Sequence, residues 1–155
     1  MVKRESSKTT GISEITGKVV RVRHATEYDM YFIEDMLRKH NVDTTGLDYN
    51  QFVIAFEDST PIGLGRLKEI DGICEIGCVI VVEERKKTGL DDVIVKHLIE
   101  FAPVKMVYAM TDKVEYFKRM GFKEVKEGSE KIIKKLGIAC KPGRRKSILM
   151  YLRKA

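Results

Sequence analysis

The sequence predicts a single-domain α/β protein in which helices flank one mixed, mostly antiparallel β-sheet. Three observations support this fold class. Strand-like and helix-like hydrophobic periodicities alternate along most of the 155 residues. The middle of the chain is typical of three consecutive antiparallel strands, with the hairpin signal Asp71-Gly72 before the third. That third strand continues through the basic turn "ERKKTG" into a helical pattern.

Period-2 alternation or short apolar runs predict strands at residues 20–23, at 52–70 as a pair with a tight turn at 58–61, and at 72–82, 104–110, 122–125 and 147–152. Apolar stripes of helical spacing predict helices at residues 32–40, 90–101, 113–120 and 129–136. Thr26 and Asp29 have the spacing of a capping box before the first helix. Pro103 and Gly121 stop the second and third helices.

Residues 1–18 are rich in Ser, Thr and Lys and lack periodicity, which predicts a flexible arm before a domain over residues 19–155. This N-terminus has no apolar core of the kind a signal peptide requires. The longest apolar stretch, residues 76–82, is far shorter than the roughly 18 residues of a membrane helix. We therefore expect a cytoplasmic protein that does not bind membranes.

The three cysteines and three histidines have no metal-ligand spacing, so we expect reduced thiols and no metal site. The formal net charge is +6. Such a charge attracts any polyanion, from nucleic acid to nucleotide cofactors with several phosphates, and does not choose between them.

The turn at residues 85–90, "RKKTGL", has two interpretations. A helix N-terminus binds phosphate through unpaired N–H groups and the positive end of the helix dipole, and Gly89 would allow close approach. Alternatively, Thr88 and Asp91 have capping-box spacing and would satisfy those N–H groups themselves. The local residues leave these two interpretations balanced.

Three segments carry a resemblance to a known family. They are "CEIGCVIVVEERKKTGLDDVIVKHLIEFA", "VEYFKRMGF" and "VRHATEYDMYFIEDML". In order and spacing they resemble the central strand–turn–helix, the second signature and the opening strand and helix of the GNAT N-acetyltransferase superfamily. The resemblance covers about residues 19–125. It implies a GNAT-like acyl-CoA N-acyltransferase fold, a seven-stranded mixed sheet splayed in the middle, with acetyl-CoA in the splay.

The resemblance also implies roles for single residues. Cys78, Val79 and Ile80 align with the apolar triplet whose backbone pairs with the pantetheine arm. Arg85, Lys86, Lys87, Thr88, Gly89 and Leu90 align with the pyrophosphate turn, whose form in the family is Arg/Gln-x-x-Gly-x-Gly/Ala. Thr88 and Leu90 depart from that form. Glu75 takes the position of a general base, and Phe117 stands where many members have a tyrosine that protonates the leaving thiolate.

The implied function is acetyl-CoA-dependent transfer of an acetyl group to a primary amine of a small molecule or a peptide. The segment "YFKRMGF" is similar to the branch that acetylates amino acids such as glutamate. A GNAT-like module that senses CoA or binds a partner without catalysis is the first alternative. A nucleic-acid-binding protein using the basic N-terminal arm and the basic turn at residues 141–146 ranks last, because no aromatic residues are evident among the basic ones on such a face. The acceptor amine and the oligomeric state, a homodimer included, are left open.

Overall fold

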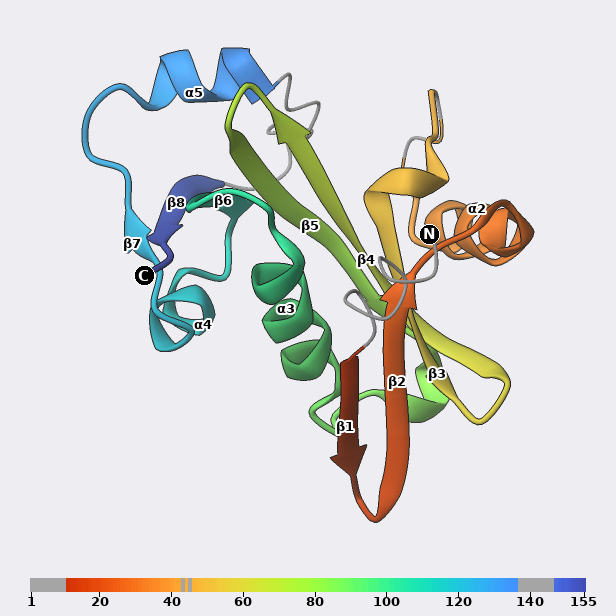
Figure 1. Cartoon of the computed structure of the whole chain (residues 1–155). Coiled ribbons are helices and arrows are strands. Elements are labelled where there is room, and N and C mark those ends of the chain that lie inside the picture. The colour runs from red at the N-terminus through yellow and green to blue at the C-terminus, as the bar shows by residue number, and fades with distance from the viewer. Residues whose placement is uncertain (1–10, 43, 45, 137–146) are drawn as a thin grey trace. The chain divides into compact units, whose positions relative to one another are not determined.

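The computed structural model describes residues 11–42, 44, 46–136 and 147–155, whose eight strands form one sheet in the order β1-β2-β3-β4-β5-β6-β8-β7 (Figure 1). The paired strands with a recorded register run antiparallel, except β5 and β6, which are parallel. The predicted mixed, mostly antiparallel sheet is therefore confirmed. The predicted basic turn at residues 141–146 lies outside the described residues, as do residues 1–10 of the predicted arm.

The strands are β1 (Gly11–Ile15), β2 (Lys18–His24), β3 (Phe52–Glu57), β4 (Thr60–Ile70), β5 (Ile73–Val81), β6 (Met106–Thr111), β7 (Lys123–Glu124) and β8 (Ile148–Arg153). The α-helices are α2 (Met30–Lys39), α3 (Leu90–Phe101), α4 (Val114–Arg119) and α5 (Ser129–Leu136). Short 3-10 helices are η1 (Glu27–Asp29), η2 (Tyr49–Gln51) and η3 (Glu83–Arg85). The chain divides into two compact units, Met1–Arg66 with Cys78–Phe101 and Leu67–Gly77 with Ala102–Ala155. Strands β4 and β5 contribute residues to both.

The core of the first unit forms where α2 packs on β3 and its neighbours. Its fully buried members include Ile33 and Leu37 of α2, Phe52 and Ile54 of β3, and Leu64 of β4. The helix follows the predicted capping box, in which Thr26 N–H donates to Asp29 Oδ2 at 2.8 Å. The apolar face predicted from the sequence is therefore the face that α2 buries.

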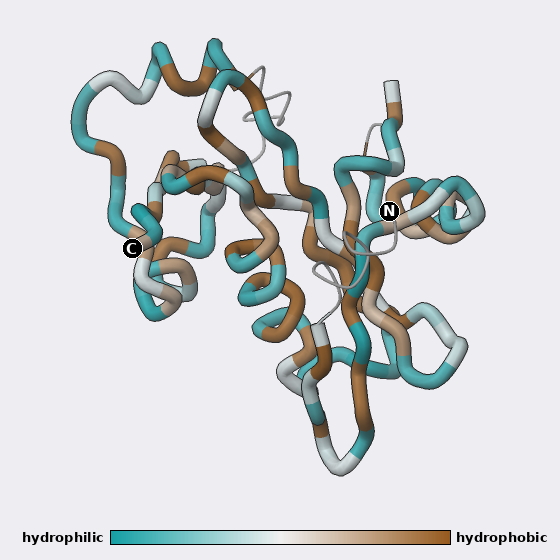
Figure 2. The backbone as a smooth tube through the Cα atoms, in the orientation of Figure 1, coloured by the Kyte–Doolittle hydropathy of each residue, from teal (hydrophilic) through white to brown (hydrophobic). Residues whose placement is uncertain are grey.

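Two glycines of β4 make room for α3. A Cβ built on Gly65 would lie 2.8 Å from both Ile94 Cγ2 and Leu98 Cδ1, and one on Gly63 would lie 2.9 Å from Ile94 Cδ1. Side chains in close-packed interiors do not tolerate such approaches without moving. Apolar and polar stretches alternate along the turns of α3 (Figure 2), and its apolar stripe therefore packs directly on the strand backbone.

Strand β1 corrects the predicted flexible arm. Residues Gly11–Ile15 pair antiparallel with β2 through a turn at residues 16–17 in which both residues have positive φ. Gly11 lies against the ring of His97 in α3, where a Cβ would come within 2.0 Å of His97 Cε1. "GISEI" is half exposed because it is an edge strand. The polar residues of this segment, which predicted a flexible arm, are therefore those of an exposed edge strand.

In the second unit, β6 is the central strand. It pairs with β5 from Ile73↔Met106 to Glu75↔Tyr108 and with β8 from Met106↔Arg153 to Thr111↔Ile148. The buried cluster on one face combines Tyr108, Leu149 and Leu136 of α5. Within the described residues, no helix has the length and apolar character needed to span a membrane.

Candidate functional site

Strand β5, helix η3 and helix α3 follow one another directly, and in the first unit they carry all of the predicted cofactor-binding residues. Cys78, Val79 and Ile80 lie in the last part of β5. Arg85 ends η3, residues 86–89 form the turn, and Leu90 begins α3. The structure therefore places these residues along one continuous stretch of backbone. Glu75 belongs to the second unit.

Cys78 has a left-handed backbone, with a φ of +50°, in the interior of β5. For a residue other than glycine this conformation costs on the order of 1–3 kcal/mol and persists only where the surrounding structure holds it. Cys78 packs against the core cluster of the first unit, to which the buried Ile80 belongs. This conformation kinks the strand and interrupts the alternation of its side chains between the two faces of the sheet, a few residues before the turn at residues 85–90. No sequence signal at this position predicts it.

Thr88 closes the turn with its side chain. Its hydroxyl donates a hydrogen bond to the Arg85 carbonyl oxygen at 2.6 Å. Lys87 and Gly89, on either side, have positive φ values of +63° and +91°. No atom of the described residues outside the immediate chain neighbours lies within 4 Å of the place where a Cβ on Gly89 would sit. The backbone at Gly89 is therefore open to close approach by a ligand.

The start of α3 presents backbone amides. Val93 N–H donates to the Gly89 carbonyl at 3.3 Å, and Asp92 N–H donates to the Asp91 carboxylate at 3.0 Å. A helix leaves its first amides without helical acceptors, which here include those of Leu90 and Asp91. The capping box that one interpretation of the sequence predicted is therefore wrong. The Thr88 hydroxyl bonds to the Arg85 carbonyl and the Asp91 carboxylate bonds to the Asp92 amide instead.

Two of the three cationic side chains at the turn are held in ion pairs. Arg85 donates to the carboxylate of Glu57 at the end of β3, and Lys86 Nζ lies 3.1 Å from Glu83 Oε1. The hydrogen bond from Arg85 holds the pKa of Glu57 below its ordinary value. Lys87 is exposed and has no ion-pair partner among the described residues. At this turn, Lys87 is therefore the cation that remains available to an anion.

The Glu57–Arg85 pair predicts a pH-dependent contribution to stability. Because the folded state lowers the pKa of Glu57 from 4.5, this contribution is fully present above the unfolded pKa and is lost as the pH falls through the folded pKa. We expect the difference in melting temperature between the wild type and Glu57→Gln to be constant between about pH 6 and pH 8 and to shrink below 4.5. Thermal unfolding followed by circular dichroism measures it. A difference that does not change with pH would contradict the assignment.

Glu75, the predicted general base, is half-buried in the second unit. It stands in register with Tyr108 of β6, so both side chains project from the same face of the sheet. Burial and the nearby Tyr151 raise the pKa of Tyr108. Cys74, one residue earlier on the opposite face, is fully buried, and burial raises the pKa of its thiol to about 11. Cys74 is therefore an unreactive thiol at neutral pH.

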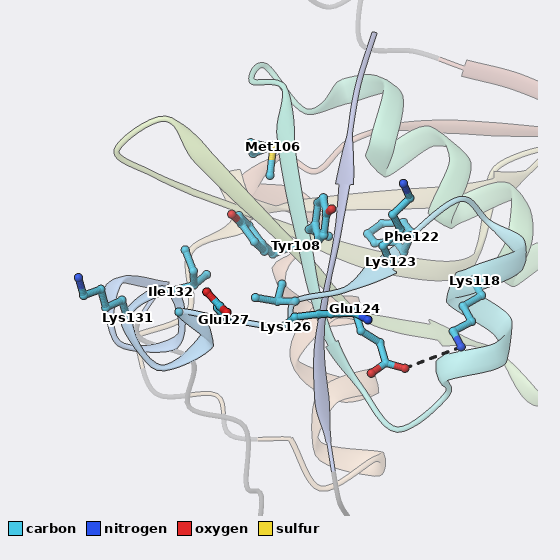
Figure 3. A pocket seen from close by; sticks show the side chains of 13 residues that line it. Met106, Tyr108, Lys118, Phe122, Lys123, Glu124, Lys126, Glu127, Lys131 and Ile132 are labelled. Carbon is cyan, nitrogen blue, oxygen red and sulfur yellow. Dashed lines mark ion pairs between the residues drawn. The ribbon is translucent and has the colours of Figure 1, made fainter.

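The second unit also contains a cavity that the sequence analysis missed. Its volume is about 890 Å³, within the range of about 300–1,000 Å³ that is usual for ligand pockets (Figure 3). Tyr108 and Tyr151 line it together with lysines from α4, β7, α5 and the segment before α5. These residues come from several separate elements of the chain, so no local sequence pattern marks the cavity. No cluster of three or more metal-ligating side chains occurs in the part of the chain that the structure describes.

No family model and no curated protein matches the sequence, whereas solved structures match its fold. N-acetylglutamate synthase from Neisseria gonorrhoeae, solved with coenzyme A and N-acetyl-glutamate, aligns with a TM-score of 0.69 at 21% identity over 88% of this chain and 35% of its own. Rv2747 from Mycobacterium tuberculosis, solved with CoA and NLQ, aligns with a TM-score of 0.71 at 21% identity over 86% of this chain and 99% of its own. Naa50 from Arabidopsis thaliana, solved with a bisubstrate analogue, aligns with a TM-score of 0.62 at 10% identity over 85% and 96%. The chain has the GNAT fold.

Within this GNAT fold, the chain spans about a third of the length of the Neisseria synthase. The departure of the turn at Leu90 has a local explanation. Leu90 is 1% exposed, and its Cδ2 lies 3.4 Å from the place of a Cβ on Gly63. The larger side chain therefore points into the core of the first unit and leaves the surface of the turn uncovered.

The aromatic helix of the GNAT resemblance is α4. Its Phe117 ring packs edge-on against Tyr116 and Phe122, with ring centroids 5.2 Å and 5.1 Å away. Phe122 is 2% exposed. The side chain at the position where a GNAT tyrosine is common therefore serves packing in this chain.

Proposed function

We propose that this protein is an acetyl-CoA-dependent N-acetyltransferase that moves an acetyl group directly to a primary amine of a small molecule, such as an amino acid, or of a peptide. The observation that carries the proposal is the β5–α3 junction, with its kinked strand, its open left-handed Gly89 and the amides at the start of α3. Proteins solved with this fold hold coenzyme A, as in the Neisseria synthase.

In this proposal the turn binds the pyrophosphate of acetyl-CoA. The amides of Gly89, Leu90 and Asp91 and the positive end of the α3 dipole would act on the phosphates, and Lys87 would add charge. Because Arg85 and Lys86 are already paired with acidic side chains, their main contribution is to hold η3 and the turn in place. Thr88 contributes in the same way through its bond to the Arg85 carbonyl.

Cys78, Val79 and Ile80 are proposed to pair with the pantetheine arm through their backbone groups. The left-handed Cys78 is the specific support for this role, because strained residues concentrate at ligand sites. The pantetheine arm is extended and contains two amide groups. Such a chain can form strand-like hydrogen bonds with the backbone of these residues whatever their side chains are.

Glu75 is proposed as the general base. An α-amine has a pKa of about 7.7–8.0 and a lysine amine one of about 10.4, so most acceptor amines are protonated at neutral pH and must lose a proton before they attack. The thioester supplies an electrophilic acetyl carbon. The ammonium group first gives one proton to the Glu75 carboxylate, directly or through water. The neutral amine nitrogen then bonds to the acetyl carbon, the carbon–sulfur bond breaks, and the second proton of the nitrogen passes to the leaving thiolate, which departs as the CoA thiol.

Calorimetric titration of the full chain with acetyl-CoA tests the proposal. We expect one site per chain with a Kd between about 1 μM and 1 mM, the usual range of KM values. Release of CoA thiol in the presence of a panel of amino acids and peptides then tests transfer. No binding at millimolar acetyl-CoA would overturn the whole proposal. Binding without transfer to any amine would leave a CoA-binding module and overturn the catalytic role.

A further inference from the structure

The cavity of the second unit is built on one face of strands β6, β8 and β7. Tyr108 of β6 pairs directly with Tyr151 of β8, and Tyr151 pairs with Lys123 of β7. Directly paired residues project from the same face of a sheet, and all three line the cavity (Figure 3). Met106, two residues before Tyr108 on β6, lines it as well, because side chains two positions apart on a strand share a face. The strand registers therefore bring these side chains together within the second unit alone.

The apolar part of the lining is aromatic and aliphatic. Tyr108 is 7% exposed and Phe122 is 2% exposed, so both rings lie at the bottom of the cavity. Val125 and Ile132 line it too, and both pack against the buried cluster that contains Tyr108. Aromatic rings attract one another in offset or edge-on arrangements. This part of the cavity therefore suits a flat aromatic ligand.

The polar part of the lining carries an excess of positive charge, with four lysines against two glutamates. Lys118 Nζ lies 3.8 Å from Glu124 Oε2, and Figure 3 shows this pair at one side of the cavity. The other three lysines are exposed and have no ion-pair partner within the described ranges of the chain; they are Lys123, Lys126 and Lys131. Of the lining carboxylates, Glu127 alone has no ion-pair partner within the same ranges. Ammonium groups on flexible side chains, in excess over carboxylates, attract an anionic group of a ligand.

The phenol group of Tyr108 adds a neutral hydrogen-bond donor. Burial and the nearby Tyr151 raise the pKa of Tyr108, so its hydroxyl stays protonated at neutral pH. A protonated phenol donates a hydrogen bond to an anionic oxygen, and such charge-assisted bonds are stronger than those between neutral groups. The cavity therefore combines an aromatic surface with groups that bind an anion.

We propose that this cavity is a second ligand site, separate from the phosphate turn, and that it binds an organic anion with an aromatic body. The ring of the ligand packs on Tyr108, Tyr151 and Phe122, and its anionic group is bound by the exposed lysines of the lining. A volume of about 890 Å³ is large enough for a ligand of two fused rings. Every lining residue belongs to the second unit, whereas the turn at residues 85–90 belongs to the first. The inference goes beyond the proposed acetyl transfer and does not depend on it.

Indole-5-carboxylate and its neutral counterpart indole-5-carboxamide test the charge requirement. Because the chain has no tryptophan, the fluorescence anisotropy of the indole reports binding when the full chain is titrated into either probe. We expect a Kd of about 0.1–1 mM for the carboxylate, as for other ligands of this size. The Kd of the carboxamide should be about tenfold higher at low ionic strength, and the difference should shrink as salt screens the lysines. Equal affinities, or no binding of the carboxylate at millimolar protein, would overturn the proposal.

A triple variant tests the lysines of the lining. Lys123→Gln/Lys126→Gln/Lys131→Gln should bring the two Kd values within about twofold of each other, through weaker binding of the carboxylate alone. The matched control removes the same charge from three exposed lysines of the second unit that do not line the cavity, Lys105→Gln/Lys134→Gln/Lys135→Gln. The control should keep the tenfold preference. If both triple variants lose it equally, the overall charge of the protein causes the preference and the proposed site is wrong.

Two further measurements test the location of the site. The ring current of the bound indole should shift the methyl resonance of Met106 in NMR spectra, assigned with Met106→Leu, and shifts confined to other methionines would overturn the proposal. Acetyl-CoA at millimolar concentration should leave the Kd of the carboxylate within about twofold. Competition between the two would make the cavity part of the cofactor site and would overturn its separate role. Because the indole titrations need no acetyl-CoA, a failure of this inference is distinguishable from a failure of the proposed function.

Discussion

Replacing Glu75 with glutamine is expected to lower kcat for acetyl transfer by about 10²–10⁴-fold, the usual contribution of a general base. The amide keeps the size of the side chain but does not accept the amine proton. The Kd for acetyl-CoA should stay within about twofold, because the proposed cofactor contacts lie in the turn and the end of β5. Steady-state kinetics with a saturating amine, together with calorimetry, measure both quantities.

The matched control for this substitution is Glu69→Gln. Glu69 is an exposed glutamate of β4 in the same unit, and its charge acts on Cys74, whose side chain projects from the face opposite to that of Glu75. Its replacement should leave kcat unchanged. Equal kcat values for the wild type and Glu75→Gln would remove Glu75 from the mechanism.

Replacing Gly89 with valine is expected to raise the Kd for acetyl-CoA by more than about tenfold. Gly89 has a φ of +91°, which a β-branched residue adopts only with strain. The substitution would also place a side chain over the open backbone of the turn, where the phosphates are proposed to bind. A loss of stability of about 1–3 kcal/mol should accompany the loss of affinity.

Gly72→Val separates strain from ligand binding. Gly72 has a φ of +85° in the hairpin between β4 and β5, and like Gly89 it has no other atom near the place of a Cβ. The two variants should lose similar stability in thermal unfolding, but only Gly89→Val should lose affinity for acetyl-CoA in calorimetry. If both variants bind acetyl-CoA as the wild type does, the turn is not the phosphate site.

The sequence was sufficient where the determining interactions are local. The Asp71-Gly72 hairpin has positive φ at both residues, as its turn chemistry requires, and α5 has the predicted bounds. Thr26 and Asp29 form their capping box because both partners lie within four residues. Strand β1 was missed because its pairing and its contact with His97 are remote from its own composition.

The candidate site was predictable only in part. The position of the turn was predicted from the local residues 85–90. The ion-pair partner of Arg85, Glu57, is 28 residues away at the end of β3 and has no local signal. The left-handed Cys78 is held by its surroundings and has no signal of its own. The pairing of Glu75 with Tyr108 and that of Lys123 with Tyr151 depend on registers between strands that are far apart in the sequence. Long-range pairing of this kind is set by the packing of the whole sheet.

Because α3 packs on Gly63 and Gly65, the distance of the turn before α3 from the sheet is determined by β4. At these two positions the side chains of α3 contact strand backbone directly. No side chain of the strand lies between them that could change its rotamer to alter the distance between the helix and the strand. Any side chain added at either glycine would lift the first turns of the helix together with their amides. Gly63 and Gly65, about twenty residues before Arg85, therefore set how closely the start of α3 and its amides approach β4. If the turn binds the phosphates as proposed, substitutions at these two glycines are expected to weaken ligand binding as well as folding.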